Sequence, residues 1–139
     1  MIESYIKDYH IGGLCFFQGT PEKQVELINN YQAMSNTPLM ISLYAEWGLG
    51  MRFKETTFSF PRQLPLGAIE DNSLIYEMGK KVAEHCKRVG IHVNFAPVVD
   101  VNNNPKNPVI NDRSFGEDKY NVAAKSYAYM RGLQEGGVI

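Results

Sequence analysis

The stretch FAPVVDVNNNPKNPVINDRSFGED, residues 95–118, begins as an apolar strand and ends as a loop dense in Asn, Asp and Pro. The loop holds a single arginine, Arg113, among acids and amides. Polar loops that follow a hydrophobic strand are common places for binding and catalytic sites. We therefore expect the rest of the chain to act as a scaffold for this loop and for a second loop at residues 44–53.

Short apolar segments of the sequence predict buried strands. Residues 11–17 form a nearly continuous apolar run, which is typical of a strand buried on both faces. Residues 39–43 and 91–98 also read as strands. A further apolar run opens at residue 138, where we expect a fourth strand to begin.

Amphipathic segments separate these strands. Apolar residues at helical spacing predict three helices and the end of a fourth, over residues 21–34, 74–89, 120–133 and 1–10. Thr20 is expected to cap the helix at residues 21–34, and one of residues 71–73 to cap the next. Residues 53–68 contain two prolines and are expected to be irregular.

The alternation of strands and helices favours an α/β fold with right-handed crossovers and a parallel sheet. We expect a partial TIM (β/α)8 barrel made of the first three β/α units and the start of a fourth strand. A whole barrel takes about 250 residues, whereas this chain has 139. Residues 1–139 would then be a single partial domain, truncated from a larger one and poorly stable because its sheet edge is open.

Several other classes of protein are disfavoured. A nucleotide-binding doubly wound fold is the main alternative, but it needs a glycine-rich turn after the first strand. Residues 18–21 hold one glycine and no lysine. A net charge of −1 argues against a nucleic-acid partner, and no apolar run is long enough to span a membrane. No secretory signal opens the chain, and the sequence assigns no compartment.

The two cysteines, Cys15 and Cys86, give no sign of a metal centre. Neither forms a CxxC pair or lies beside a histidine at ligand spacing. Both fall on apolar faces of predicted elements, so we expect buried free thiols.

Arg113 is the most informative candidate residue. In a barrel, the carboxyl ends of the strands form one rim, and this rim would hold Asp, Asn, Arg, Glu and one Trp. Such groups suit a polyhydroxylated ligand, because carboxylates and arginine can each bond two adjacent hydroxyls. Arg113 could face this ligand while held by Asp112, Glu117 or Asp118, or it could form a purely structural ion pair in the loop.

The other candidate residues carry weaker signals. Arg52 could point into the site, but an exposed surface arginine is the default expectation. Trp47 could pack or could form a platform for a ligand, and Asp100 is expected to bond loop amides. The histidines lack a carboxylate partner at usable spacing and are expected to be solvated or satisfied in the core: His10, His85 and His92.

Four blocks of the sequence, residues 12–17, 45–53, 94–101 and above all 107–116, resemble the N-terminal barrel domain of glycoside hydrolase family 3. The resemblance runs through nearly the whole chain and is nearest to the bacterial beta-N-acetylhexosaminidase branch. It implies a retaining glycosidase that acts on terminal beta-linked sugars, with N-acetylglucosamine as the expected sugar. Such an enzyme uses a carboxylate nucleophile and a covalent glycosyl intermediate, with no metal and no organic cofactor.

The resemblance also assigns substrate-binding residues. Arg113 and Arg52 match the family's substrate-binding arginines. Tyr44 stands where the family normally has an aspartate that bonds sugar hydroxyls. A phenol gives and accepts one bond and cannot clamp two hydroxyls as a carboxylate does, so sugar affinity or identity is expected to differ. Glu46, two residues further on, is not expected to compensate.

No catalytic residue is expected within this chain. In the resembling branch, the acid/base is a His–Asp pair that follows a Lys-His-Phe-Pro-Gly-His-Gly block, and the nucleophile is a later aspartate. Residues 1–139 contain no such block. The chain alone is therefore expected to be inactive. The alternative within the same family is a catalytically dead, sugar-binding remnant, which the tyrosine at residue 44 suggests.

Overall fold

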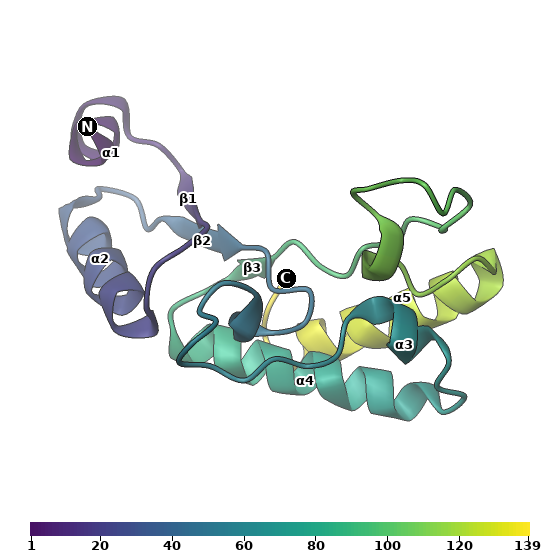
Figure 1. Ribbon diagram of the computed structural model, residues 1–139. Helices are drawn as coiled ribbons and strands as arrows, with labels where there is room; N and C mark the ends of the chain where they lie inside the picture. Colours follow the sequence, from purple (N-terminus) through teal and green to yellow (C-terminus); the bar gives the residue numbers. More distant parts are fainter.

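Three short strands lie side by side in the computed structural model, which describes all residues, 1–139 (Figure 1). They are β1 (Gly13–Phe16), β2 (Met40–Leu43) and β3 (Val93–Asn94), in the sheet order β1-β2-β3. Both pairs of neighbours are parallel, and the register aligns Phe16 with Leu43 and Leu43 with Asn94. The predicted α/β fold with a parallel sheet is thus confirmed.

The helices connect and cover these strands. They are α1 (Ile2–Tyr9), α2 (Pro21–Met34), α3 (Gln63–Gly67), α4 (Asn72–Arg88) and α5 (Lys119–Glu135), with short 3-10 turns η1 (Leu49–Met51) and η2 (Asn111–Arg113). Thr20 caps α2 by accepting from the Lys23 amide at 3.2 Å, and Asp71 caps α4 by accepting from Ser73 at 2.9 Å. Both caps agree with the sequence-based expectation. None of the helices has the length and apolar character needed to cross a membrane.

Two predicted elements differ from the structure. The third strand spans two residues instead of residues 91–98, since the chain soon reaches Pro97, which has no N–H to add to a strand ladder. The segment 53–68 was predicted to be irregular because of its two prolines, but it contains the short helix α3. The expected start of a fourth strand is present as pairing: the Ile139 amide donates to His92 O at 3.0 Å, and Asn94 N donates to Ile139 O at 2.7 Å.

The expectation that residues 11–17 are buried on both faces is wrong. β1 forms an edge of the sheet, and its residues alternate between exposed and half-buried. Cys15 is consequently exposed rather than buried, whereas Cys86, on the inner face of α4, is buried as predicted. An uninterrupted apolar run therefore did not distinguish an edge strand from a central one.

The helices α4 and α5, both in the C-terminal half of the sequence, pack side by side (Figure 1). They approach closely at Gly79 and Gly132, where a Cβ added to Gly132 would lie 3.0 Å from the Gly79 Cα. Small residues at a crossing let two helix backbones approach each other. This tight contact places Tyr129, one turn before Gly132, in the core beneath the loop that follows β2.

Candidate functional site

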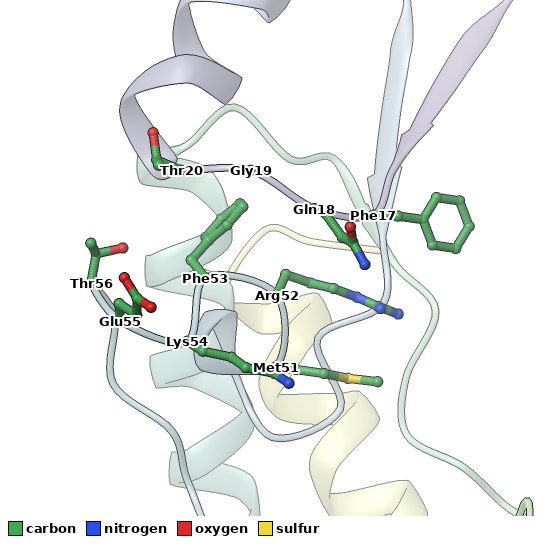
Figure 2. A pocket seen from close by; sticks show the side chains of 10 residues that line it. All are labelled: Phe17, Gln18, Gly19, Thr20, Met51, Arg52, Phe53, Lys54, Glu55 and Thr56. Atoms are coloured by element: carbon green, nitrogen blue, oxygen red, sulfur yellow. The ribbon is translucent and has the colours of Figure 1, made fainter.

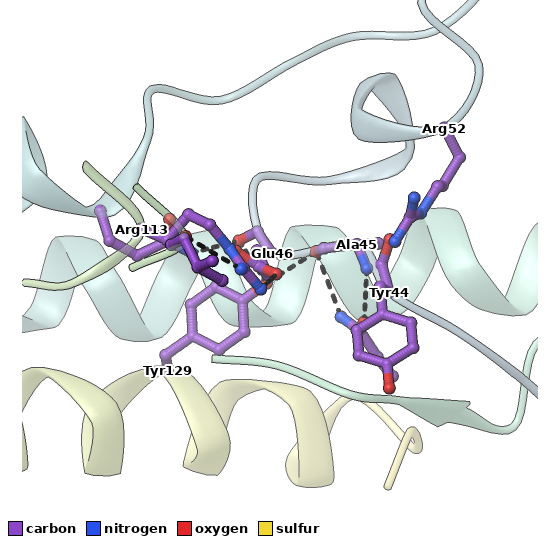
Figure 3. Close-up of polar contacts among 9 residues, drawn as sticks. Tyr44, Ala45, Glu46, Arg52, Arg113 and Tyr129 are labelled. Atoms are coloured by element: carbon purple, nitrogen blue, oxygen red, sulfur yellow. Dashed lines mark hydrogen bonds and ion pairs between the residues drawn. The ribbon is translucent and has the colours of Figure 1, made fainter. Parts of the chain in front are cut away.

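The loops that follow β2 and β3 meet through a partly buried ion pair (Figure 3). Arg113 Nε donates to Glu46 Oε2 at 3.0 Å, and Arg113 Nη2 donates to Glu46 Oε1 at 2.7 Å. The Glu46 side chain is fully buried, while 28% of the Arg113 side chain is exposed. This bidentate geometry is the strong form of an arginine–carboxylate contact, and it ties the two loops together at the carboxyl ends of the strands.

The predicted partners of Arg113 were wrong. Asp112 pairs with Arg62 at 2.7 Å instead, Glu117 is exposed, and Asp118 caps α5 by accepting from the Tyr120 amide. Neighbours in sequence are poor guides where a loop folds across another loop. The usable signal was Glu46 itself, because a carboxylate that becomes buried close to the end of a strand needs a cationic partner.

The backbone that carries Glu46 is held by side chains from three other segments. Asn94 accepts from the Ala45 amide at 2.8 Å and donates to the Ala45 carbonyl at 3.3 Å. Gln63 Nε2 donates to Glu46 O at 3.0 Å, and the Tyr129 hydroxyl lies 3.1 Å from the same oxygen. Burial raises the pKa of Tyr129, so its hydroxyl stays a donor. Glu46 is therefore fixed before any ligand arrives.

Arg113 keeps donors available after these contacts. A guanidinium has five N–H groups, and three are used, two by Glu46 and one by Val109 O at 3.2 Å. Two N–H groups remain on a side chain that is partly exposed. The hydrogen bonds to Glu46 raise the pKa of Arg113, with smaller contributions from Asp100 and Asp112. The group is thus a permanent cation with two free donors.

Arg52 is not the exposed surface arginine that was the default expectation. It is half-buried, and its Nε donates to Tyr44 O at 2.7 Å. Its guanidinium carbon lies 5.5 Å from the Phe17 ring centroid and 5.6 Å from that of Tyr44. Figure 2 shows the side chain reaching from the loop toward Phe17 along a cleft of about 450 Å³ that Gln18 also lines. Cation–π contact and one hydrogen bond hold it there.

Tyr44 lies in a row of three aromatic rings. Its ring is stacked on Phe17, with centroids 5.9 Å apart, and tilted against Phe95 at 5.2 Å. The sheet register explains the row, because each ring belongs to the residue directly after the aligned positions Phe16, Leu43 and Asn94. Sequence reasoning missed Phe17, which ends the predicted strand 11–17, and Phe95, which was placed inside the predicted strand 91–98 but directly follows β3 in the structure.

Trp47 and Asp100, the weaker candidate residues, make contacts within the protein. Trp47 packs against Arg62, whose guanidinium carbon lies 4.7 Å from the Trp47 ring. The Asp100 carboxylate bonds no loop amide, contrary to expectation; it is exposed, and only its backbone carbonyl is used, by the Ser114 hydroxyl at 2.6 Å.

The histidines fit the expectation that they are solvated or satisfied. His92 Nδ1 accepts from the Ile41 amide at 3.0 Å. His85 is half-buried against the Phe60 ring, and His10 is exposed at the end of α1. No three His, Cys, Asp or Glu side chains gather as a metal site would require, and the expectation of no cofactor stays a prediction.

Comparison with known families gives the site its context. The model for the "Glycosyl hydrolase family 3 N terminal domain" matches residues 1–139. The chain belongs to glycosyl hydrolase family 3. This membership confirms the family resemblance of the sequence and rules out the nucleotide-binding alternative.

The proteins that resemble this chain include named hexosaminidases. Beta-hexosaminidase A of Pseudoalteromonas piscicida is 31% identical over 150 residues, which cover 99% of this chain and 25% of the relative. Beta-hexosaminidase LpqI of Mycobacterium tuberculosis is 29% identical, with 99% and 36% covered. This family 3 chain therefore spans well under half the length of these relatives.

Solved structures of similar proteins share the fold. A beta-N-acetylglucosaminidase from Paenibacillus sp. str. FPU-7 superposes with a TM-score of 0.90 and 34% identity, covering 98% of this chain and 27% of that one. NagZ from Neisseria gonorrhoeae, solved in complex with N-trifluoroacetyl-D-glucosamine, gives a TM-score of 0.84 at 28% identity, with 97% and 43% covered. These neighbours agree with the α/β barrel class expected from the sequence.

Proposed function

We propose that residues 1–139 form one side of the sugar site of a retaining beta-glycosidase that acts on terminal N-acetylglucosaminides. The observation that carries this proposal is the Glu46–Arg113 pair, which leaves two arginine donors on the rim. A fixed guanidinium fork suits adjacent oxygen acceptors such as those of a sugar. The names of the relatives, beta-hexosaminidase and beta-N-acetylglucosaminidase, support the choice of sugar.

Three residues are proposed to bind substrate. Arg113 offers its two remaining N–H groups, and Arg52 offers the four that Tyr44 O does not use. Tyr44 offers a hydroxyl at the end of β2. Because Glu46 and the two loops hold these groups in place, little ordering is needed when a ligand binds.

The proposed roles exclude Glu46 as the nucleophile. Its carboxylate is fully buried, and both oxygens accept from Arg113. We propose that the nucleophile and the acid/base of the double displacement come from outside residues 1–139, on further strands of a closed barrel. Pairing of Ile139 with β3 supports such a continuation, and residues 1–139 would then be a partial domain that is inactive alone.

A binding assay tests the sugar site. The 139-residue protein is titrated with methyl N-acetyl-beta-glucosaminide, and Arg113→Lys is compared with Arg131→Lys, which changes an exposed pair on α5. We expect binding to weaken at least about tenfold in R113K, because an ammonium lacks the fork geometry, and to be unchanged in R131K. Equal affinities in R113K and the unmodified protein would contradict the proposal, as would no binding at all.

A chimeric protein distinguishes the proposed enzyme from the alternative, a catalytically dead sugar-binding remnant. The tyrosine at residue 44 is the feature that favours this alternative. Residues 1–139 replace the matching segment of the Pseudoalteromonas piscicida relative, and hydrolysis of p-nitrophenyl N-acetyl-beta-glucosaminide is measured. Turnover supports the enzyme, and sugar binding without turnover supports the remnant. The 139-residue protein alone is expected to give no turnover, and measurable hydrolysis by it would refute the proposed division of roles.

A further inference from the structure

Arg62 links the same two loops as the Glu46–Arg113 pair, but through the residues next to that pair. Its guanidinium carbon lies 4.7 Å from the ring centroid of Trp47, which directly follows Glu46. Its Nη1 donates to Asp112 Oδ2 at 2.7 Å, and Asp112 directly precedes Arg113. Arg62 therefore contacts a neighbour of each member of the pair and makes no hydrogen bond to either member.

The backbone that carries Arg62 is fixed by the short helix α3, which begins at the next residue. Gln63 is fully buried, and its Nε2 donates to Glu46 O at 3.0 Å. At the other end of α3, Asn121 Nδ2 donates to Gly67 O at 2.9 Å. Because α3 is held at both ends, the Arg62 side chain extends from a backbone that cannot follow Asp112 if that residue moves.

Asp112 carries a carboxylate that could compete for the free donors of Arg113. The Glu46 hydrogen bonds raise the pKa of Arg113 most, and the charge of Asp112 adds to this rise, so the two neighbours interact electrostatically. A carboxylate binds a guanidinium more strongly than a neutral hydroxyl does. Without Arg62, the Asp112 carboxylate would be an unpaired anion next to two unused N–H groups, and it would compete there with an uncharged sugar.

We propose that Arg62 is a positioning residue that holds the Asp112 carboxylate away from Arg113 and so keeps two guanidinium donors free for the ligand. This inference rests on the proposed sugar site. Arg62 acts on the ligand only through Asp112 and Arg113. The arrangement favours an uncharged polyhydroxylated ligand, because such a ligand depends most on the removal of a competing anion.

A double-mutant cycle tests this role. Methyl N-acetyl-beta-glucosaminide is titrated against the unmodified protein, Arg62→Met, Asp112→Asn and the double variant. Methionine keeps an unbranched apolar side chain beside Trp47 and removes the charge, and asparagine keeps the shape of Asp112 without its charge. We expect R62M to weaken binding at least about fivefold, because a charge-assisted hydrogen bond replaces the sugar at Arg113. D112N and the double variant are expected to bind within about twofold of the unmodified protein.

Recovery in the double variant is the decisive readout. If the Arg62–Asp112 pair only tied the loops together, removing its second half would not restore what removing the first half had lost. Arg62→Lys gives a further check, because the pair uses a single N–O contact that an ammonium can also make. R62K is expected to bind the sugar as the unmodified protein does.

Arg131→Met is the matched control for the loss of an exposed arginine. Arg131 pairs with Glu135 at side-chain exposures of 48% and 40%, close to the 52% and 42% of Arg62 and Asp112. Its guanidinium also lies over an aromatic ring, that of Tyr127. R131M is expected to leave the dissociation constant unchanged.

Several results would overturn the inference. If D112N weakens binding as much as R62M and the double variant does not recover, the pair ties the loops and does not withhold a competitor. If R113K weakens binding while R62M leaves it unchanged, the sugar site stands and Arg62 has no role in it. If R131M weakens binding as R62M does, the loss is not specific to Arg62. If the unmodified protein binds no sugar, the proposed function fails and this inference fails with it.

Discussion

Glu46 and Arg113 lie 67 residues apart in sequence and are joined by two hydrogen bonds of 3.0 and 2.7 Å. The carboxylate has no exposure, whereas the guanidinium is partly exposed. One end of the pair is therefore anchored in the core and the other meets solvent. Removing the anchor should affect both stability and the orientation of the exposed donors.

We expect Glu46→Gln to lower the free energy of unfolding by about 1–3 kcal/mol, because the amide cannot accept both arginine hydrogen bonds. Urea denaturation measures the change. Glu84→Gln is the control: Glu84 forms an exposed pair with Lys81, and exposed pairs contribute about 0–1 kcal/mol. Equal effects of E46Q and E84Q would show that the Glu46–Arg113 pair adds no more than a surface contact.

The crossing of α4 and α5 predicts a second effect. In Gly132→Ala the new methyl group would meet the Gly79 Cα at 3.0 Å and the Tyr76 carbonyl oxygen still more closely. We expect a loss of about 1–3 kcal/mol from overpacking, measured by thermal unfolding. Gly12→Ala, where nothing lies within 4 Å of the added Cβ, should be near neutral. If G132A leaves the free energy of unfolding unchanged, α4 and α5 can move apart at no loss of stability, which would contradict this prediction.

The stability of the fold should decrease in mild acid through His85. Burial lowers the pKa of His85, so the unfolded state, with a pKa of about 6.5, binds the proton more readily than the folded state. The free energy of unfolding therefore falls as the pH drops through the unfolded pKa toward the lower folded one. The decrease between about pH 7.5 and about pH 5 should be smaller in His85→Gln. An unchanged pH dependence of stability in H85Q would show that groups other than His85 cause the loss of stability in acid.

The two thiols should differ in reactivity. Cys15 is exposed on the edge strand, whereas burial raises the pKa of Cys86 to about 12. Because the thiolate is the reactive form, a chromogenic disulfide reagent should modify one thiol in the native protein and both after denaturation. Cys15→Ser should abolish the native reaction. Rapid reaction of C15S would show that the α4 core opens readily.

Much of this fold was accessible from the sequence because local patterns encode it. The cap at Thr20 and a cap within residues 71–73 followed from N-cap chemistry, and the parallel sheet followed from the alternation of strands and helices. The exposure of β1 did not follow, because an apolar run does not indicate whether other residues within 1–139 cover both faces of the strand. Neither did the partner of Arg113, since a contact across 67 residues depends on how two loops cross.

The sequence predicted which loops lie at the strand ends but not how their side chains pack. Arg113 and Arg52 lie in the loops that follow β3 and β2, as the sequence predicted, but the stacking of Phe17 and Phe95 on Tyr44 was not predicted. It arises from sheet register, which aligns residues that are far apart in the chain. Their roles toward a sugar stay predictions.

The most direct test of the account is a nuclear magnetic resonance titration of the arginine Nε–H groups with methyl N-acetyl-beta-glucosaminide. The account predicts that Arg113 and Arg52 shift along one saturating curve, because both guanidinium groups meet the same sugar. Arg131, paired with Glu135 on the exposed side of α5, should not move. Shifts of equal size at all arginines, or none at Arg113, would contradict the claim that these loops form a sugar site.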